Sequence, residues 1–313
     1  QGGGAQGGGA QGGGAQGGGA QGGGAQGGMS AGGSAQVSDT ANWPMPNAPG
    51  LGLPNSASYD DTSTPGVAHD LVTHLDWPKN PGIMRYARAD AASYCDTLSL
   101  GSFNDWHLPS FIELVSLFDI VPTLDDATQN QNYIAPVFQA SGAYWSTDNA
   151  ASNSQLARIV DFGAAGCGDG GSTCSIGASA DPKMTLGGAF CVRNEAAPPA
   201  TARFTIAADH VTDTRTGLAW LVLPADSQNG AAIDAFTSCT SLGNGAREPS
   251  INELLTILTP SLDATAFPGW PANTFAWSSS AIAGMPGSFW AGGITGASEA
   301  SAGTDMNHVQ CVR

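Results

Sequence analysis

The sequence is poor in basic residues and has no long apolar run, and each absence excludes a class of partner. Only 10 lysines and arginines face 26 acidic residues, which gives a formal net charge of −16. A chain of that charge repels polyanions at long range, so we expect no binding of nucleic acid. The roughly 20 consecutive apolar residues of a membrane helix are also missing, and we expect no membrane insertion.

The sequence also lacks the motifs of catalysis and of zinc binding. It contains no G-x-S-x-G, no H-E-x-x-H and no phosphate-binding G-x-x-x-x-G-K-[ST], so we expect a protein without enzymatic activity. There is no C-x-x-C, and the five histidines are not grouped at ligand spacing, which argues against a zinc site.

Calcium leaves two interpretations open. Five aspartates supply oxygen ligands, but no D-x-[DN]-x-[DN]-G loop is present, and solvated surface is the favoured interpretation. We expect no metal or other cofactor. The five are Asp60, Asp61, Asp125, Asp126 and Asp169.

The six cysteines form an even set in an acidic chain rich in glycine, serine, threonine and asparagine. Such a composition is typical of exported proteins whose cysteines form disulfides. We therefore expect a secreted protein at the cell surface or in the extracellular space.

The chain opens with a low-complexity segment. Residues 1–28 repeat the pentapeptide Gln-Gly-Gly-Gly-Ala, which has no side chains to bury and should remain a disordered tether. Residues 29–58, rich in proline, serine, asparagine and glycine, extend the irregular region. Residues 1–58 are thus predicted to be a tether and linker.

The rest of the sequence is duplicated. Each copy has a short β-prone run ending in tryptophan, a helix with cysteine, a Pro-Ser segment followed by Glu-Leu, a Trp-Ser block and a closing Cys-Val-Arg. The blocks are 72–77, 94–98, 106–114, 144–147 and 190–193 in the first copy, and 211–220, 238–242, 247–254, 276–279 and 310–313 in the second. The proline and alanine between them predict a boundary near residue 198, giving domains 59–197 and 198–313.

The Pro-Ser segments predict two helix starts. Ser110 with Glu113, and Ser250 with Glu253, have the spacing of a capping box ahead of apolar residues at helical period. Capping, rather than catalysis, is therefore the favoured role of both glutamates.

The duplication also selects a disulfide pattern. Six cysteines allow 15 connectivities, but equivalent residues should form equivalent bonds. We therefore expect three disulfides, each closing a loop within one copy. They are Cys95–Cys191, Cys167–Cys174 and Cys239–Cys311.

In this order of motifs, the sequence resembles the family known as DUF1566, the Legionella collagen-like adhesin C-terminal (Lcl C-terminal) domain, in two tandem copies over about 66–193 and 204–313. The resemblance implies an α+β fold of two C-type-lectin-like domains, related to sulfatase-modifying-factor domains, with short helices on small antiparallel sheets. It also implies an exported bacterial protein used in adhesion.

The sequence departs from the family at one loop. Where the family has Trp-Arg-Leu-Pro, the first copy has Trp106 to Pro109 with a histidine second, and the second copy has Ala246 to Pro249 with Arg-Glu in the middle. The net charge of −16 offers no basic patch for sulfated polysaccharides, so that ligand of the adhesin is not expected here.

The stretch from Trp270 to His308 combines aromatic with small polar residues, a mixture that suits ligand contact. We expect adhesion to a glycan or to a surface protein of a host or neighbouring cell. The alternative is a structural, self-associating surface or filament protein. For Trp277 the core is the favoured position, while for Trp270 and Trp290 core and ligand site stay equally open. The candidate ligand residues are Trp270, Phe289, Trp290, Asn307 and His308.

Overall fold

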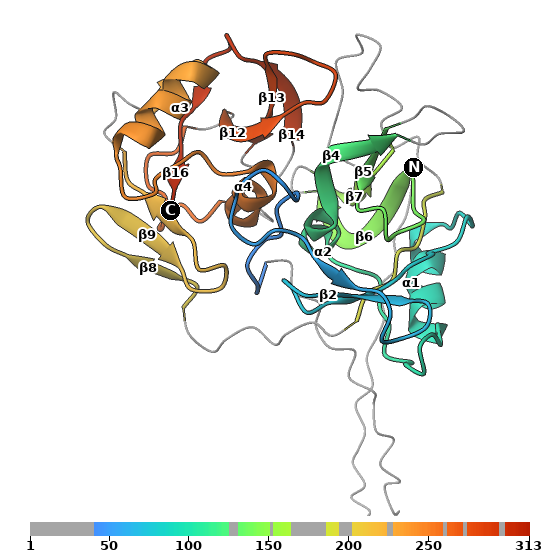
Figure 1. Cartoon of the computed structure of the whole chain (residues 1–313). Coiled ribbons are helices and arrows are strands. Elements are labelled where there is room, and N and C mark those ends of the chain that lie inside the picture. The colour runs from blue at the N-terminus through green and yellow to red at the C-terminus, as the bar shows by residue number, and fades with distance from the viewer. Residues whose placement is uncertain are drawn as a thin grey trace, which may run out of the picture. The chain divides into compact units, whose positions relative to one another are not determined.

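The computed structural model describes residues 41–124, 131–150, 153–163, 186–193, 202–223, 228–258, 262–271, 274–293 and 298–313. Residues Val37–Arg313 form one compact unit. The predicted tether over residues 1–28 and the predicted Cys167–Cys174 disulfide lie outside the described residues. The described fold is mixed α+β with small sheets and short helices, as the sequence predicts (Figure 1).

The first half opens with a three-stranded antiparallel sheet and continues with two helices and two β-hairpins. Its elements are β1 (Tyr59–Asp60), β2 (Val67–Asp70), β3 (Asp76–Pro78), α1 (Arg88–Thr97), α2 (Phe111–Ser116), β4 (Phe118–Leu124), β5 (Gln131–Ile134), β6 (Ala143–Ala150) and β7 (Asn153–Asp161).

The second half has a four-stranded sheet in the order β16-β10-β9-β8 and a five-stranded sheet in the order β11-β15-β12-β13-β14, in which only β12 and β15 are parallel. Its elements are β8 (Phe204–Ile206), β9 (His210–Asp213), β10 (Ala219–Leu221), β11 (Asn229–Gly230), α3 (Ala232–Ser241), α4 (Ile251–Leu258), β12 (Phe275–Ala281), β13 (Ser288–Gly293), β14 (Ser298–Ala302), β15 (Asn307–His308) and β16 (Cys311–Val312).

The two halves make the same contact at the tryptophan of each Trp-Ser block. In the first half the indole Nε1 of Trp145 donates to the carbonyl of Tyr86 at 2.8 Å. In the second half Trp277 donates to the carbonyl of Gly230, also at 2.8 Å. Each acceptor lies two residues before the first residue of the helix that contains a disulfide cysteine.

The closing segments match in the same way. His107 exchanges backbone hydrogen bonds with Val192, and Arg247 exchanges the corresponding pair with Val312. The neighbouring cysteines form the disulfides Cys95–Cys191 and Cys239–Cys311, each with Cα atoms 5.4 Å apart. Both predicted pairs are confirmed, and each stabilises the fold by a few kcal/mol, about 2–4, through restriction of the unfolded chain.

The capping boxes lie where the sequence predicts them. Ser110 and Glu113 cap each other at the start of α2. At the start of α4 the Ser250 amide donates to Glu253 Oε2 at 2.8 Å, and the Glu253 amide donates to Ser250 Oγ at 3.2 Å. Both glutamates are buried, so their carboxylates serve the helix ends. No helix in the described part of the chain is long and apolar enough to cross a membrane.

The halves share part of one core, because α2 and α4 pack near each other. The Trp290 ring meets the Phe118 ring edge to face with centroids 6.0 Å apart. The Asn252 side chain donates to the carbonyl of Phe118 at 2.8 Å and to that of Pro46 at 3.2 Å. These contacts explain why the described chain forms one unit, whereas the division into domains 59–197 and 198–313 stays a prediction.

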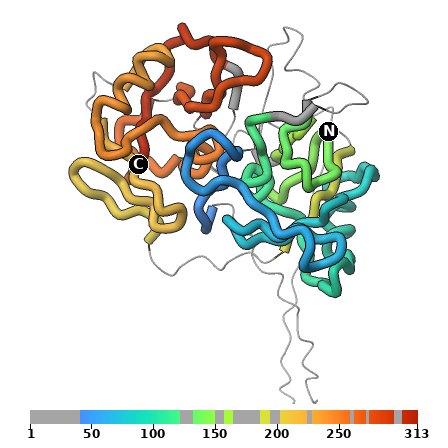
Figure 2. Tube along the Cα trace, viewed as in Figure 1, coloured from blue at the N-terminus to red at the C-terminus, as the bar shows by residue number. Residues whose placement is uncertain are grey.

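The segment 41–58 differs from the predicted linker. It contains no helix or strand, as expected, but Trp43 is 3% exposed and Met45 1% exposed. Asn47 donates to Glu253 Oε1 of α4 at 3.2 Å, and the blue tube of this segment lies beside α4 (Figure 2). Its apolar side chains complete the shared core, which linker composition does not indicate.

Candidate functional site: a cavity beside helix α3

Two of the predicted ligand residues, Trp270 and His308, contact each other in the second half. Their ring centroids are 4.2 Å apart. His308 is buried, and burial lowers the pKa of its imidazole to about 4. The hollow beside this pair has a volume of about 80 Å³, far below the roughly 300–1,000 Å³ of ordinary ligand sites. The pair therefore borders a space for water rather than for a sugar ring.

Trp290 lies in the core. Only 2% of it is exposed, and its ring packs on Phe118 and Tyr133 of the first half. A tryptophan enclosed in this way has no face left for a ligand, which corrects the prediction of ligand contact. Trp277 is fully buried, in agreement with its favoured assignment to the core.

Asn307 and Phe289 lie in two further places. The Asn307 side chain donates to Ser301 Oγ at 2.9 Å, and Ser301 Oγ donates to Asp305 at 2.9 Å. Asn307 is thereby used to hold the turn between β14 and β15. Phe289 is half-buried and lines a separate, larger cavity, so the predicted ligand residues do not form one site.

This larger cavity lies between α3 and the β12-β13-β14 strands and measures about 670 Å³. Its volume falls within the range of small-molecule and side-chain binding sites, roughly 300–1,000 Å³. We call it the α3 cavity. Its lining residues are Ala232, Ile233, Phe236, Glu248, Ser279, Pro286, Gly287, Ser288, Phe289, Ala302, Gly303 and Thr304.

Apolar side chains form the rim of the α3 cavity. Ile233 and Phe236 on α3 are 68% and 54% exposed, although both are large and apolar. On the facing strand, Phe289 packs edge to face on Trp277 with centroids 6.2 Å apart. Exposed apolar side chains beside a cavity of this size are typical of interaction sites.

Among the described residues, Glu248 supplies the one carboxyl group that lines the α3 cavity. Glu248 is 7% exposed, and its Oε1 atom has no hydrogen-bond partner. Burial raises the pKa of this carboxyl to about 7. A buried polar atom without a partner costs free energy, about 1–3 kcal/mol or more for a charged group. Such a group inside a cavity is a candidate for ligand contact.

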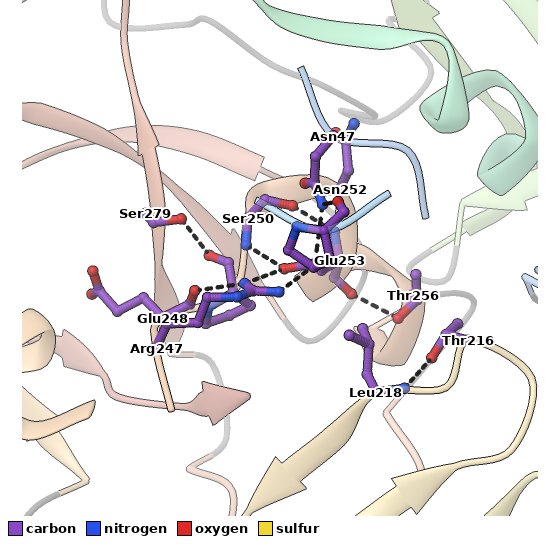
Figure 3. A network of polar contacts seen from close by, with 12 residues as sticks. Asn47, Thr216, Leu218, Arg247, Glu248, Ser250, Asn252, Glu253, Thr256 and Ser279 are labelled. Atoms are coloured by element: carbon purple, nitrogen blue, oxygen red, sulfur yellow. Dashed lines mark hydrogen bonds and ion pairs between the residues drawn. The ribbon is translucent and has the colours of Figure 1, made fainter. Parts of the chain in front are cut away.

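The start of α4 holds Glu248 in place. The Arg247 guanidinium binds both carboxylate oxygens of Glu253 at 2.7 Å, and Ser279 donates to the carbonyl of Pro249. Figure 3 shows the Glu248 carboxyl pointing away from the Arg247–Glu253 pair. Glu253 is thus used in the capping network of α4, whereas the neighbouring Glu248 lines the cavity.

The sequence prediction missed Glu248. Its only signal is the departure at Ala246 to Pro249, where the family motif has leucine at the position of Glu248. That departure predicts a changed loop, but periodicity does not show that the new side chain faces a cavity.

Of the five aspartates considered as calcium ligands, the structure describes Asp60 and Asp61. Asp60 accepts hydrogen bonds from Thr62 and Ser63 in a local turn, and Asp61 lies 3.8 Å from Lys79. In the ranges that the structure describes, no group of three or more His, Cys, Asp or Glu side chains has the arrangement of a metal site. The remaining three, Asp125, Asp126 and Asp169, lie outside the described residues.

Comparison with known protein families finds a match to part of the chain. Comparison of the sequence with curated proteins finds no match. Residues 66–176 match the Lcl C-terminal domain, a stretch that begins just before β2 and extends beyond β7. The predicted resemblance is therefore confirmed for the greater part of the first half, which is similar to the Lcl C-terminal domain.

Proposed function

We propose that the protein is an extracellular bacterial recognition protein that binds a glycan or a surface protein in the α3 cavity. The single observation on which this rests is the cavity of about 670 Å³ with an apolar rim and one buried carboxyl. The two disulfides and the low content of basic residues suit an extracellular location. The match to the Lcl C-terminal domain supports a surface protein related to adhesins.

The proposal includes a duplication, in which residues 204–313 are a second copy of the unit over 66–193. It is supported by the paired contacts of Trp145 with Tyr86 and of Trp277 with Gly230, and by the two equivalent disulfides. The C-type-lectin-like kinship is part of the same proposal. Binding rather than catalysis is proposed because the sequence contains none of the catalytic motifs sought above.

Binding of the labelled full chain to glycan arrays and to cell-surface protein preparations tests the proposal. Phe236→Ala removes part of the cavity rim and should weaken binding. Leu242→Ala is the matched control, because Leu242 is also an exposed apolar residue of the α3 region and does not line the cavity. Equal binding by both variants and the wild type would exclude the α3 cavity as the recognition site.

The exposed pair Ile233 and Phe236 also favours a second candidate function, self-association. In that case the cavity rim would bury against another copy of the chain. Sedimentation over a range of concentrations separates the two functions. A recognition protein keeps one molecular mass, whereas the apparent mass of a self-associating protein rises with concentration. This rise should be absent in Phe236→Ala.

A further inference from the structure

The first half has an arginine at the helix position that corresponds to Ala232, a residue lining the α3 cavity. Arg88 and Ala232 are the first residues of α1 and α3, the two helices that contain a disulfide cysteine at the same helical position. The residues before them, Ala87 and Ala231, both have extended backbone and precede the helix in the same way. The long side chain of Arg88 thus corresponds to a single methyl group at Ala232.

The Arg88 guanidinium crosses from α1 to β6. Its Nε donates to the carbonyl of Ser146 at 2.9 Å, its Nη2 donates to the carbonyl of Thr147, and its Nη1 donates to Asn149 at 2.7 Å. A planar guanidinium suits this arrangement, because its N–H groups fan out toward several acceptors at once.

The strand opposite Ala232 is built like β6. Thr147 and Ser279 correspond, because their amides donate to the carbonyls of Pro109 and Pro249. Ser279 lines the α3 cavity together with Ala232. The second half therefore has the strand backbone that accepts from a guanidinium in the first half, with Ala281 at the position of the third acceptor Asn149, but lacks the arginine.

The second half has a carboxyl at the same place. Leu108 and Glu248 correspond, since each lies directly before one of these two matched prolines. Leu108 is 3% exposed and packs in an apolar cluster with the disulfide Cys95. In the second half that apolar residue is replaced by the buried acid that lines the cavity. Around this space the second half thus has no counterpart of Arg88 and carries an acid where the first half has Leu108.

We propose, building on the function proposed above, that the α3 cavity binds the guanidinium group of an arginine side chain from a partner protein. Glu248 is the anion that pairs with it, and the apolar rim of Ile233, Phe236 and Phe289 packs on the methylene stem of the arginine. The net charge of −16 attracts basic partners from a distance. Burial raises the pKa of Glu248 to about 7, and an adjacent cation favours its ionised form.

Titration of the full chain with Nα-acetyl-arginine methylamide tests the proposal, with binding followed by NMR shifts. The control probe is the citrulline counterpart, which has the same shape without the charge. We expect saturable binding of the arginine probe, and at least about tenfold weaker binding of the citrulline probe, because a charge-assisted pair is lost. Absence of saturable arginine binding, or equal binding of the two probes, overturns the proposal.

Variants at Glu248 locate the bound probe. Glu248→Gln keeps the shape of the side chain and should weaken arginine binding at least about tenfold. Glu248→Leu restores the first-half residue and should give the same loss, with thermal unfolding as the check on folding. Unchanged arginine binding in folded Glu248→Gln overturns the assignment.

Ala232→Arg tests the same idea from inside the chain. It restores the arginine of the first half, so its guanidinium should occupy the cavity, abolish binding of the arginine probe and raise the midpoint of thermal unfolding. Thr237→Arg is the matched control, because it adds the same charge to an exposed position of α3 outside the cavity. Equal probe binding by folded Ala232→Arg and by Thr237→Arg contradicts the proposal.

The two proposals fail in different ways. If Phe236→Ala abolishes binding to surface ligands but the arginine probe does not bind, the recognition function stands and the guanidinium assignment is wrong. If the arginine probe binds through Glu248 but Phe236→Ala leaves the binding of surface ligands unchanged, the guanidinium assignment stands and the recognition function is wrong.

Discussion

At the scale of single residues, Glu248 is an acid in an apolar setting. Its Oε1 atom has no hydrogen-bond partner, and no ion pair to this side chain is found in the described ranges. Leu108 at the corresponding position packs without this penalty. The replacement therefore costs folding free energy, as is common where a buried group serves binding.

The cost of Glu248 should depend on pH. Burial raises its pKa from 4.5 to about 7, so the folded chain holds this proton more tightly than the unfolded chain. Relative to Glu248→Gln, the wild type is therefore most stable below about pH 4.5 and loses stability as the pH rises through 7. The shift corresponds to about 3 kcal/mol. Denaturant unfolding of both proteins from pH 4 to pH 8 measures it, and a constant difference would contradict the buried carboxyl.

The sequence predicts the roles of residues that belong to a local or repeated pattern, but it does not predict the role of Glu248. The capping glutamates Glu113 and Glu253 follow from a spacing of three, and the buried Trp277 from its counterpart Trp145. The position of Glu248 in a cavity depends on what the facing strand leaves open, which one sequence does not display.

At the scale of elements, the starts of α2 and α4 are each stabilised by a capping box. In α4 this box also binds Arg247 through Glu253, and Arg247 in turn donates to the backbone carbonyl of Glu248. The sequence predicts these helix starts correctly because capping depends on residues a few positions apart.

Ser250→Ala should remove one cap and lower the free energy of unfolding by about 1 kcal/mol, since the Glu253 amide loses its acceptor. Ser241→Ala at the exposed end of α3 is the control and should change it by less than about 0.5 kcal/mol. Urea titration of the two variants measures the difference. Equal effects would show that the box does not support α4.

At the scale of the whole molecule, the halves are joined by contacts between α2, α4 and the segment 41–58. Asn252 bonds Phe118 and Pro46 at once, and Trp290 packs across to Phe118. The sequence could not show this, because periodicity identifies a buried face but not the element that covers it. For that reason the sequence indicates Trp290 as a candidate ligand residue. It likewise places Trp43 and Met45 in a predicted linker.

Trp290→Ala should therefore weaken both halves together. Loss of a buried tryptophan typically costs about 3–5 kcal/mol, and the shared core predicts one cooperative unfolding transition at a lower midpoint. Hydrogen exchange that follows amides in both β3 and β10 checks this. Two transitions, with the first half unaffected, would instead support independent domains divided near residue 198.

The proposed guanidinium site rests on the contrast between Arg88, which donates to β6 in the first half, and Ala232, which lines the α3 cavity in the second. A crystal structure of the full chain with Nα-acetyl-arginine methylamide tests this most directly. We expect the guanidinium of the probe in the α3 cavity, within hydrogen-bond distance of the Glu248 carboxyl. A cavity filled by the protein's own side chains, or a probe bound elsewhere, would contradict it.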